Sequence, residues 1–291
     1  MGNKNIMKKY PLKAFSLIEI SVVIVIIGIL IAGISSGIDL YQEYRSTVAR
    51  SLTTNSPLIR INDLAMWIDA SSVESYQTLP KDGVKINLLK DIKTSRDKIN
   101  FTQSVVSKQP IYRNSLINGV GGIEFDGIDD YMTSENSVLS QNISQLGQIT
   151  IFMVTNILTS SGTGVFFKFE TGLSRVGFEI NNGKIRFDFP TGAFNAITNN
   201  VLSNKNLIIM ATSDKINQKL FINNQLATSL TNSNGLSSNL SSPLLLGIHS
   251  DYTSLLTKFN LGELIIYDRA LNDREINLIT AYLSKKWGIK I

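Results

Sequence analysis

The longest hydrophobic pattern in the chain lies near its N-terminus. From Phe15 to Ile38 almost every side chain is small or apolar, and Glu19 is the single charged residue. About 24 helical residues span roughly 36 Å, more than the ~30 Å hydrocarbon core of a bilayer. A core helix of a soluble protein would show a polar face, and Ile20 to Ile34 shows almost none. The pattern therefore predicts a membrane-spanning helix.

Polar residues reappear after Ile38 without an immediate helix breaker. Tyr41 and Tyr44 are suited to the interface between membrane and water. The run Thr53-Thr54-Asn55-Ser56-Pro57 then contains the residue types that end helices. We therefore expect one long helix over residues 15–54 and a brief linker over residues 55–60.

Beyond Ile61 the pattern changes to short apolar or alternating runs separated by Gly, Asn and Ser. Ile149 to Val154 is typical of a strand. Gly177 to Phe189 is typical of a hairpin, because Asn182-Gly183 suits a two-residue turn. Further strands are predicted at residues 207–212, 219–222, 244–247 and 262–267. Many closely spaced strands indicate a mainly β fold, with one antiparallel β-sandwich over residues 61–291.

Within that domain only the C-terminal end shows a clear helical pattern. Asn272 is placed to cap a helix, with Glu275 at the third helical position. An apolar stripe follows at Ile276, Ile279, Leu283 and Trp287. Lys285 and Lys286 complement the carboxyl end of the helix dipole. The pattern predicts a short C-terminal helix.

Positive charge is concentrated in the first 14 residues, which contain four lysines and no acid. The formal net charge is +5, so the rest of the chain is nearly neutral. A nearly neutral body lacks the basic footprint of a nucleic-acid-binding protein, so no nucleic-acid partner is expected. The lysine-rich start is typical of a segment held at the cytoplasmic face of a membrane. The absence of cysteine excludes disulfides and thiolate metal sites.

Two common kinds of N-terminal segment fit the apolar run less well. A secretory signal has a shorter apolar region, followed by a small-residue cleavage site that is missing here. A plain signal anchor fits the length and the flanking lysines but does not account for Glu19. A charged residue at the membrane centre costs about 2.5–3.5 kcal/mol on insertion scales, so a carboxylate at this depth usually has a specific partner.

The stretch Lys13-Ala14-Phe15-Ser16-Leu17-Ile18-Glu19 resembles the processing site of type IV prepilins and pseudopilins. The resemblance implies a leader over residues 1–14, which a prepilin peptidase removes by cutting between Ala14 and Phe15. It also implies methylation of the new amine of Phe15. The family usually has Gly before the cut, and Ala14 departs from that pattern. The implied location is the bacterial inner membrane, with the C-terminal domain outside the cytoplasm, or a pilus or pseudopilus.

Glu19 then becomes the fifth residue of the mature chain, and its charge needs an explanation. One hypothesis is that it neutralises the Phe15 amine of a neighbouring pilin or pseudopilin subunit, which would set the stagger between subunits. The alternative is that Glu19 lies in the headgroup region at the helix start, where the helix dipole favours an acid.

Several phrases in residues 61–291 are similar to the laminin-G-like, concanavalin-A-like jelly roll. They are the opening Asp63 to Ala70, the turn Gly122 to Tyr131, the closing Leu261 to Asp273 and the terminal Tyr282 to Gly288. The resemblance implies a lectin-like jelly roll that binds carbohydrate or a host or cell surface. Calcium binding is also common among such domains.

The acidic residues of the Gly122 to Tyr131 phrase have three readings. Glu124-x-Asp126-x-x-Asp129 is close to the Glu-x-Asp-x-x-Glu strand of jelly-roll glycanases, whose carboxylates act as nucleophile and acid. Gly127 interrupts that strand, which favours a turn whose Asp side chains bond backbone amides. Asp126, Asp129 and Asp130 are also candidate oxygen ligands for Ca²⁺.

Other candidate site residues are few. His249 is the single histidine and is expected in a surface loop, so a His-based triad or zinc site is not indicated. The polar stretch from Ser229 to Ser242 is expected to be a loop that could bond a glycan. Trp67 and Trp287 lie in apolar patterns and are expected in the core.

These patterns favour a pilin-like or pseudopilin subunit that displays a binding domain for adhesion or secretion, and no enzyme activity is expected. A membrane-tethered lectin that does not assemble is the first alternative. A tethered glycan hydrolase is the second.

Overall fold

The computed structural model describes residues 16–95, 97–159, 162–171, 174–189, 196–198, 204–231, 240–249 and 251–291. The chain divides into two units, residues 1–43 and 44–291. The expected processing residues Ala14 and Phe15 lie outside the described residues, as do residues 232–239 of the expected polar loop.

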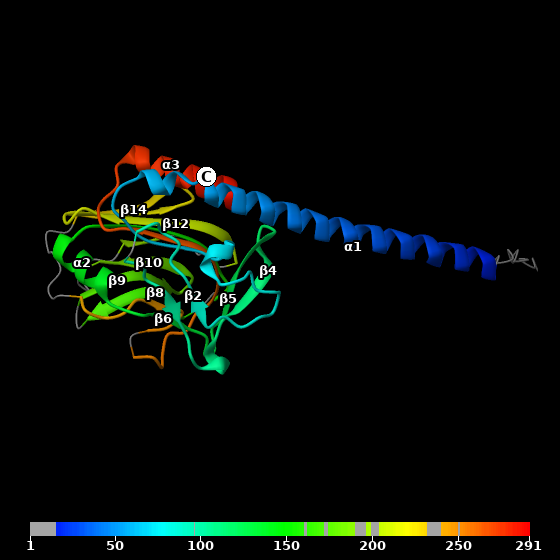
Figure 1. Ribbon diagram of the computed structural model, residues 1–291, viewed down its shortest axis with the longest axis horizontal. Coiled ribbons are helices and arrows are strands. Elements are labelled where there is room, and N and C mark those ends of the chain that lie inside the picture. The colour runs from blue at the N-terminus through cyan, green and yellow to red at the C-terminus, as the bar shows by residue number, and fades with distance from the viewer. Residues whose placement is uncertain are drawn as a thin grey trace, which may run out of the picture. The chain divides into compact units, whose positions relative to one another are not determined.

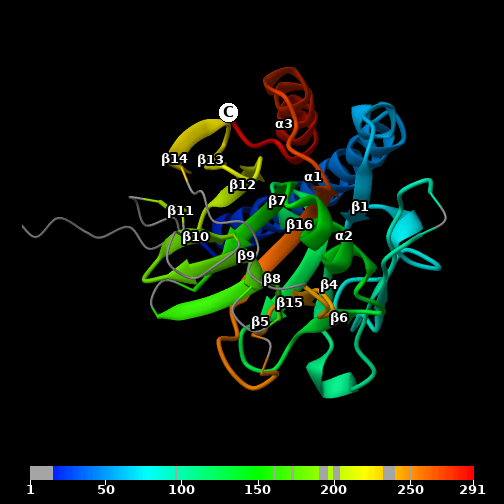
Figure 2. The ribbon, with the colours of Figure 1, turned by 90° about the vertical axis from the view of Figure 1, so that its left-hand side faces the viewer.

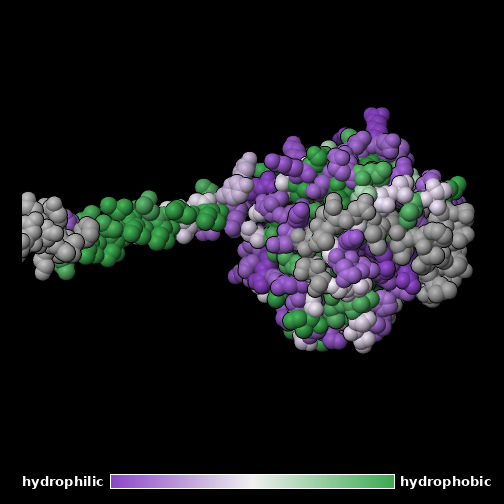
Figure 3. Space-filling model, turned by 180° about the vertical axis from the view of Figure 1, so that it is seen from behind, coloured by the Kyte–Doolittle hydropathy of each residue, from purple (hydrophilic) through white to green (hydrophobic). Residues whose placement is uncertain are grey.

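The N-terminal apolar segment forms a helix, as expected. Helix α1 covers Leu17–Thr54, and its 38 residues end at the predicted stop signal. The apolar side chains of α1 that belong to the first unit of the chain are exposed. They form a hydrophobic surface along the visible side of the helix in Figure 3. In the described part of the chain it is the one helix long and apolar enough to cross a membrane, a test that a signal sequence also passes.

The strands of the second unit form two antiparallel sheets among the described residues (Figure 2). The first sheet has the spatial order β14 (Gln225–Thr231), β13 (Asn217–Ile222), β12 (Asn206–Ser213), β7 (Ile149–Ile157), β16 (Lys258–Tyr267), β5 (Val120–Asp126) and β4 (Ile111–Ile117), and β1 (Leu64–Asp69) also pairs with β16. The second has the order β11 (Ala196–Ile197), β10 (Lys184–Asp188), β9 (Ser174–Asn181), β8 (Thr163–Thr171), β15 (Leu245–Leu246), β6 (Met132–Ser134), β3 (Phe101–Thr102) and β2 (Leu88–Leu89).

The sheets pack face to face because each strand alternates its side chains between two sides. The inner sides form one apolar core, in which Phe125 stacks on Phe259 with ring centroids 4.5 Å apart. Phe166 and Phe178 continue this aromatic layer from the second sheet. The mainly β sandwich predicted from the alternation is confirmed, including the hairpin at Asn182-Gly183.

Two local predictions were wrong. A second helix, α2 (Val138–Leu146), lies inside the sandwich domain, where only the C-terminal helix was expected. It is short and rich in Ser, Asn and Gln, so its apolar stripe, with Leu139 and Ile143 buried, is too brief to stand out in the sequence. The predicted loop from Ser229 is also strand until Thr231, because it pairs with β13.

The outer side of the first sheet is covered by helix α3 (Asp273–Trp287), which lies on that side in Figure 1. The predicted capping box is present, with the Asn272 side chain accepting from the Glu275 amide at 3.0 Å and the Glu275 carboxylate accepting from the Asn272 amide at 3.0 Å. The last turns of α1, from Tyr44, belong to the same unit, and Ala49 is buried there. The segment expected as a linker contains a 3₁₀ turn, Pro57–Arg60, with Leu58 fully buried.

Lys286, which was expected to complement the carboxyl end of the helix dipole, is buried. Its side chain is 0% exposed, and its Nζ lies 2.5 Å from Asp69 Oδ2 and 2.8 Å from Glu263 Oε2. We call these three residues the central charge cluster. Burial raises the pKa of Glu263, and the ammonium of Lys286 opposes that rise. Lys285, its neighbour, is exposed.

Neutral donors complete this cluster. The indole N–H groups of Trp67 and Trp287 each donate to Glu263 at 2.8 Å, and the Tyr282 hydroxyl donates to it at 2.9 Å. The Thr53 hydroxyl of α1 donates to Asp69 at 2.6 Å. Both tryptophans are therefore core residues, as predicted, but they also carry hydrogen bonds that the apolar pattern did not indicate.

We predict that Lys286→Met lowers the free energy of unfolding by about 3–5 kcal/mol, because it leaves two buried carboxylates without their cation. Urea unfolding of the full chain in a mild detergent, followed by near-UV circular dichroism of the two tryptophans, measures this change.

Lys285→Met is the matched control, since it removes the same charge one residue away from an exposed position. We expect it to change the stability by less than about 0.5 kcal/mol. Equal effects of the two substitutions would show that the central charge cluster does not hold the domain together.

Candidate functional site

A turn rich in carboxylates follows the end of β5 and leads into β6. We call residues Asp126 to Asp130 the acid turn. Gly127 has a φ of +73°, and a Cβ there would lie 2.5 Å from the backbone nitrogen of Lys258 on β16. Only glycine fits this approach, so the strand must end where the sequence analysis placed the interruption.

The side chain of Asp126 organises this turn. Its Oδ1 accepts from the amides of Ile128, Asp129 and Asp130 at 2.8, 3.2 and 3.3 Å. Asp130 Oδ2 accepts in return from the Asp126 amide at 3.1 Å. This is the bonding predicted by the turn reading of the motif.

Asp130 is the carboxylate with the most unusual environment in the turn. Asp130 is only 4% exposed. Burial chiefly raises its pKa to about 6, the carboxylates of Asp126 and Asp129 act in the same direction, and the hydrogen bond from the Asp126 amide opposes them. The acid turn therefore holds a carboxyl group that titrates closer to neutral pH than an ordinary aspartate.

The carboxylate oxygens of the acid turn are the kind of ligand that a hard cation such as Ca²⁺ prefers. One carboxylate oxygen from each of Asp126, Asp129 and Asp130 lies within 4.8 Å of the others. Ca²⁺ takes six to eight oxygen ligands, so these side chains would supply part of its shell and water or backbone oxygens the rest. Calcium binding stays a prediction.

A second loop lies against the acid turn. Its described residues are 247–249 and 251–255, and a Cβ on Gly247 would lie 3.0 Å from the backbone oxygen of Asp130. Asp251 organises this loop, because its Oδ1 accepts from the amides of Thr253 and Ser254, both at 2.9 Å. The Ser254 hydroxyl and the Thr253 amide hold the pKa of Asp251 well below its usual range.

His249 lies in this loop but is not the plain surface residue that was expected. Its side chain is 24% exposed, with Nε2 3.3 Å from Glu170 Oε2 and Nδ1 3.5 Å from Asp251 Oδ2. Glu170 lies on β8 and Asp251 lies in the loop itself, so His249 connects the loop to β8. Its environment is that of a structural contact between two acids.

The residues of the glycanase-like pattern are engaged by other groups. Glu124 Oε2 accepts from Arg113 Nε at 2.6 Å, and Asp126 is occupied by the turn amides. Arg113 also lies 3.7 Å from Asp82. Glu124 and Asp126 therefore each have a local partner, and these two positions of the pattern correspond to an ion pair followed by a turn.

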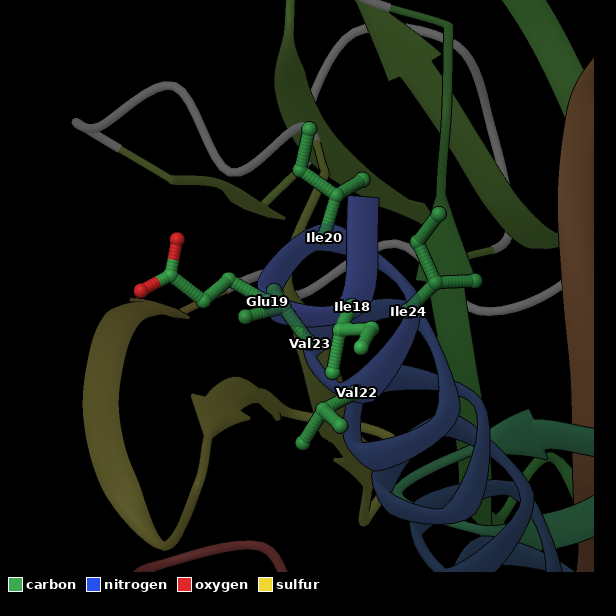
Figure 4. A pocket seen from close by; sticks show the side chains of 6 residues that line it. All are labelled: Ile18, Glu19, Ile20, Val22, Val23 and Ile24. Atoms are coloured by element: carbon green, nitrogen blue, oxygen red, sulfur yellow. The ribbon is translucent and has the colours of Figure 1, made fainter. Parts of the chain in front are cut away.

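Glu19 lies at the start of α1, away from the sandwich unit in the sequence. Its Oε2 accepts from the Ser16 amide at 2.7 Å, while the Ser16 hydroxyl accepts from the Glu19 amide at 3.1 Å. Figure 4 shows its carboxylate pointing outward from the helix, among apolar neighbours such as Ile18 and Val22. The hollow drawn there is lined by α1 alone, so it is an open apolar surface and not a ligand cavity.

The sequence analysis missed a group of charged residues on the second sheet. We call Lys168, Glu179, Arg186 and Asp188 the second-sheet charge cluster. Lys168 Nζ lies 2.5 Å from Glu179 Oε1, Arg186 Nε lies 2.9 Å from Asp188 Oδ1, and Arg186 also pairs with Glu179. Burial, together with the carboxylate of Glu179, raises the pKa of Asp188 to about 7. The signal in the sequence was the alternation of charges with phenylalanines in β8 and β10.

The sequence model Laminin_G_3, described as the concanavalin A-like lectin/glucanases superfamily, matches residues 126–277, just over half of the chain. The chain belongs to this superfamily. Its matched region begins at the acid turn and ends inside α3, so it contains most of both sheets. No curated protein matches the sequence.

Solved structures share the fold of the chain at low identity. A Trypanosoma rangeli sialidase in complex with 2,3-difluorosialic acid is 14% identical with a TM-score of 0.54, over 77% of this chain and 33% of that one. The botulinum neurotoxin serotype D binding domain is 14% identical with a TM-score of 0.56, over 78% and 52%. The binding domain of Paraclostridial Mosquitocidal Protein 1 is 16% identical with a TM-score of 0.56, over 78% and 53%.

These likenesses show the fold alone. The chain matches about a third of the sialidase and about half of each toxin chain. The lectin-like jelly roll expected from the sequence phrases is therefore confirmed, and the activities of these larger proteins are not transferred by the match.

We predict that Asp130→Asn stabilises the protein at pH 8 by about 1 kcal/mol and not at pH 4. The folded pKa of Asp130 lies above that of an unfolded aspartate, so its stabilising contribution is complete at low pH. That contribution is lost as the pH rises through about 6, where the buried carboxyl must ionise. Urea unfolding of the full chain in detergent with EDTA, at both pH values, measures the difference.

Glu74→Gln serves as the control, because it neutralises an exposed carboxylate on the same domain. We expect this control to show no such dependence on pH. A gain for Asp130→Asn that is the same at pH 4 and pH 8 would mean that packing, and not ionisation, is responsible.

Proposed function

We propose that this protein is a membrane-anchored, pilin-like subunit that displays a carbohydrate-binding sandwich outside the cytoplasm, for adhesion or as part of a secretion pseudopilus. The observation that carries the proposal is the single helix α1, which begins in an apolar segment and ends in the core of a lectin-like domain. Its residues from Tyr44 belong to the sandwich unit.

The attachment between helix and sandwich is built from specific contacts within residues 44–291. Thr53 bonds Asp69 of the central charge cluster, and Arg45 Nη2 donates to the backbone oxygen of Lys286 at 3.3 Å. Arg50 donates to the backbone oxygen of Ser71 at 3.4 Å. A flexible tether would have no need of such bonds, so they support a subunit in which the last turns of α1, from Tyr44, are part of the sandwich unit.

The assembly part of the proposal depends on Glu19. An isolated carboxylate inside an apolar helix is unfavourable in a bilayer unless it has a partner. A processed neighbour would offer one, the amine of its Phe15, so that both charges are satisfied only in the polymer. The small residue Ala14 before Phe15 fits a peptidase that cuts at this point.

The carbohydrate part rests on the superfamily and on the similar structures. The chain belongs to a superfamily of lectins and glucanases, and one similar structure is a sialidase with a bound sialic acid derivative. The others are toxin binding domains. Binding is favoured over hydrolysis because Glu124 is paired with Arg113 and Asp126 with the turn amides.

A tethered lectin that does not assemble is the second candidate. One observation favours it: the Glu19 carboxylate bonds the Ser16 amide of its own chain. This bond gives Glu19 a role at the start of α1 without any second subunit.

We predict that the native chain begins with methylated Phe15 in cells that have a working prepilin peptidase. We also predict that Glu19→Ala abolishes assembly into filaments, while the processed chain stays in the membrane. Intact-protein mass spectrometry and sedimentation of sheared filaments measure these outcomes. Glu43→Ala, an exposed acid on the same helix, should leave assembly unchanged.

A native chain that still begins at Met1 would remove the pilin-like part of the proposal. Correct processing with normal membrane insertion, but no filaments from the wild type, would favour the tethered lectin.

We predict that the full chain in lipid nanodiscs binds glycans on a panel of mannose-, galactose-, N-acetylglucosamine- and sialic-acid-terminated oligosaccharides, and that it releases no sugar from them. Glycan-array fluorescence and reducing-end analysis are the two measurements. Glu124→Gln should leave binding within about threefold of the wild type, because its carboxylate serves an ion pair.

Sugar release that Glu124→Gln abolishes would instead establish a hydrolase. Absence of binding to every member of the panel would contradict the carbohydrate part of the proposal.

A further inference from the structure

Two tyrosines from different loops meet beside the acid turn. Tyr131 follows directly after Asp130, and Tyr252 belongs to the loop that lies against the turn. Their rings are 6.0 Å apart at an interplanar angle of 62°, with Tyr252 42% exposed and Tyr131 half-buried. Single exposed aromatic residues are ordinary on protein surfaces, but this tyrosine pair has an inner ring that supports an outer one.

The backbone holds Tyr252 in an unfavourable conformation. Its φ is +58°, in the left-handed region that bulky residues rarely adopt. The Tyr252 amide donates to the His249 carbonyl at 3.0 Å, and the His249 amide donates to the Ser254 carbonyl at 3.2 Å. With the Asp251 bonds to Thr253 and Ser254, these contacts enforce the conformation. Such enforced strain is concentrated at functional sites.

Tyr131 is fixed from the opposite side. Its amide donates to the Lys108 carbonyl at 3.2 Å, and its carbonyl accepts from Gln103 Nε2 at 3.0 Å. The Lys108 ammonium lies 5.5 Å from the centroid of the Tyr131 ring, in a cation–π arrangement. Three segments distant in the sequence therefore combine to present one exposed ring on a rigid base.

We propose that Tyr252, supported by Tyr131, is the stacking surface for a pyranose ring, and that the acid turn receives hydroxyl groups of the same sugar through the half-buried carboxylate of Asp129. This inference rests on the proposed carbohydrate binding and places it at one end of the sandwich. The C–H face of a pyranose carries partial positive charge and fits the negative face of an aromatic ring. Hydroxyl groups at the sugar edge donate to carboxylates in charge-assisted hydrogen bonds.

The charges around the tyrosine pair select the class of sugar. The acid turn contributes three carboxylates whose oxygens lie within 4.8 Å of one another, and Lys108 is already placed over the ring of Tyr131. An anionic sugar would be repelled here. The site therefore takes neutral or N-acetylated hexoses in preference to sialic acid, unlike the sialidase that shares the fold.

The test compares variants of the full chain in nanodiscs on the glycan panel described above. Tyr252→Asn removes the ring and keeps a residue that adopts the left-handed backbone readily, so the loop conformation is preserved. Tyr252→Phe keeps the ring without its hydroxyl. Tyr44→Ala is the control, because Tyr44 is an exposed tyrosine on α1.

We expect Tyr252→Asn to weaken binding of the best neutral hexose probe by about tenfold or more, with Tyr252→Phe and Tyr44→Ala within about threefold of the wild type. Biolayer interferometry gives the Kd values. Saturation-transfer NMR should mark the C–H protons of one sugar face in the wild type and not in Tyr252→Asn.

Unchanged binding in Tyr252→Asn would overturn the stacking surface while leaving the proposed function intact. A preference of the wild type for sialic-acid probes would overturn the assignment of sugar class. A wild type that binds no member of the panel would overturn the proposed carbohydrate function and this inference together.

Discussion

The burial of Lys286 between Asp69 and Glu263 is the constraint on which the rest of the sandwich unit depends. A charge inside an apolar region is tolerable only when all of its partners are in place. These partners come from β1, β16 and α3, and Thr53 adds the end of α1. Segments far apart in the chain must therefore meet in one arrangement for these charges to be paired.

Strand β16 transmits this constraint to the candidate site. Glu263 lies in the central charge cluster, and Lys258, at the start of the same strand, contacts Gly127 of the acid turn. The strand is paired along its length with β5, β7 and β1, so it cannot shift without disturbing the first sheet. The loop that carries Tyr252 enters β16 directly, and the acid turn leaves β5 beside it. The site is thus built on rigid elements, although its side chains come from loops.

Buried carboxylates recur in this protein, and their surroundings give them different roles. Glu263 has a full set of donors and serves structure. Asp130 and Asp188 are buried among other acids, which brings their pKa values to about 6 and about 7. Of these three carboxylates, Asp130 is the one that directly precedes a member of the tyrosine pair, Tyr131. The acid turn and the tyrosine pair together form the surface that we propose binds the sugar.

The sequence by itself determined the apolar helix, several of the strands, the Asn182-Gly183 hairpin and the capped C-terminal helix, because each follows from neighbouring residues and a regular period. It also identified the Asp126 turn, whose bonds are local. Only the tertiary structure decided that Lys286 is buried, that Asp188 joins a charge cluster and that Tyr252 meets Tyr131. Burial and pairing of this kind depend on residues far apart in the chain, and no local pattern encodes which side chain will lie opposite another once the sheets have packed.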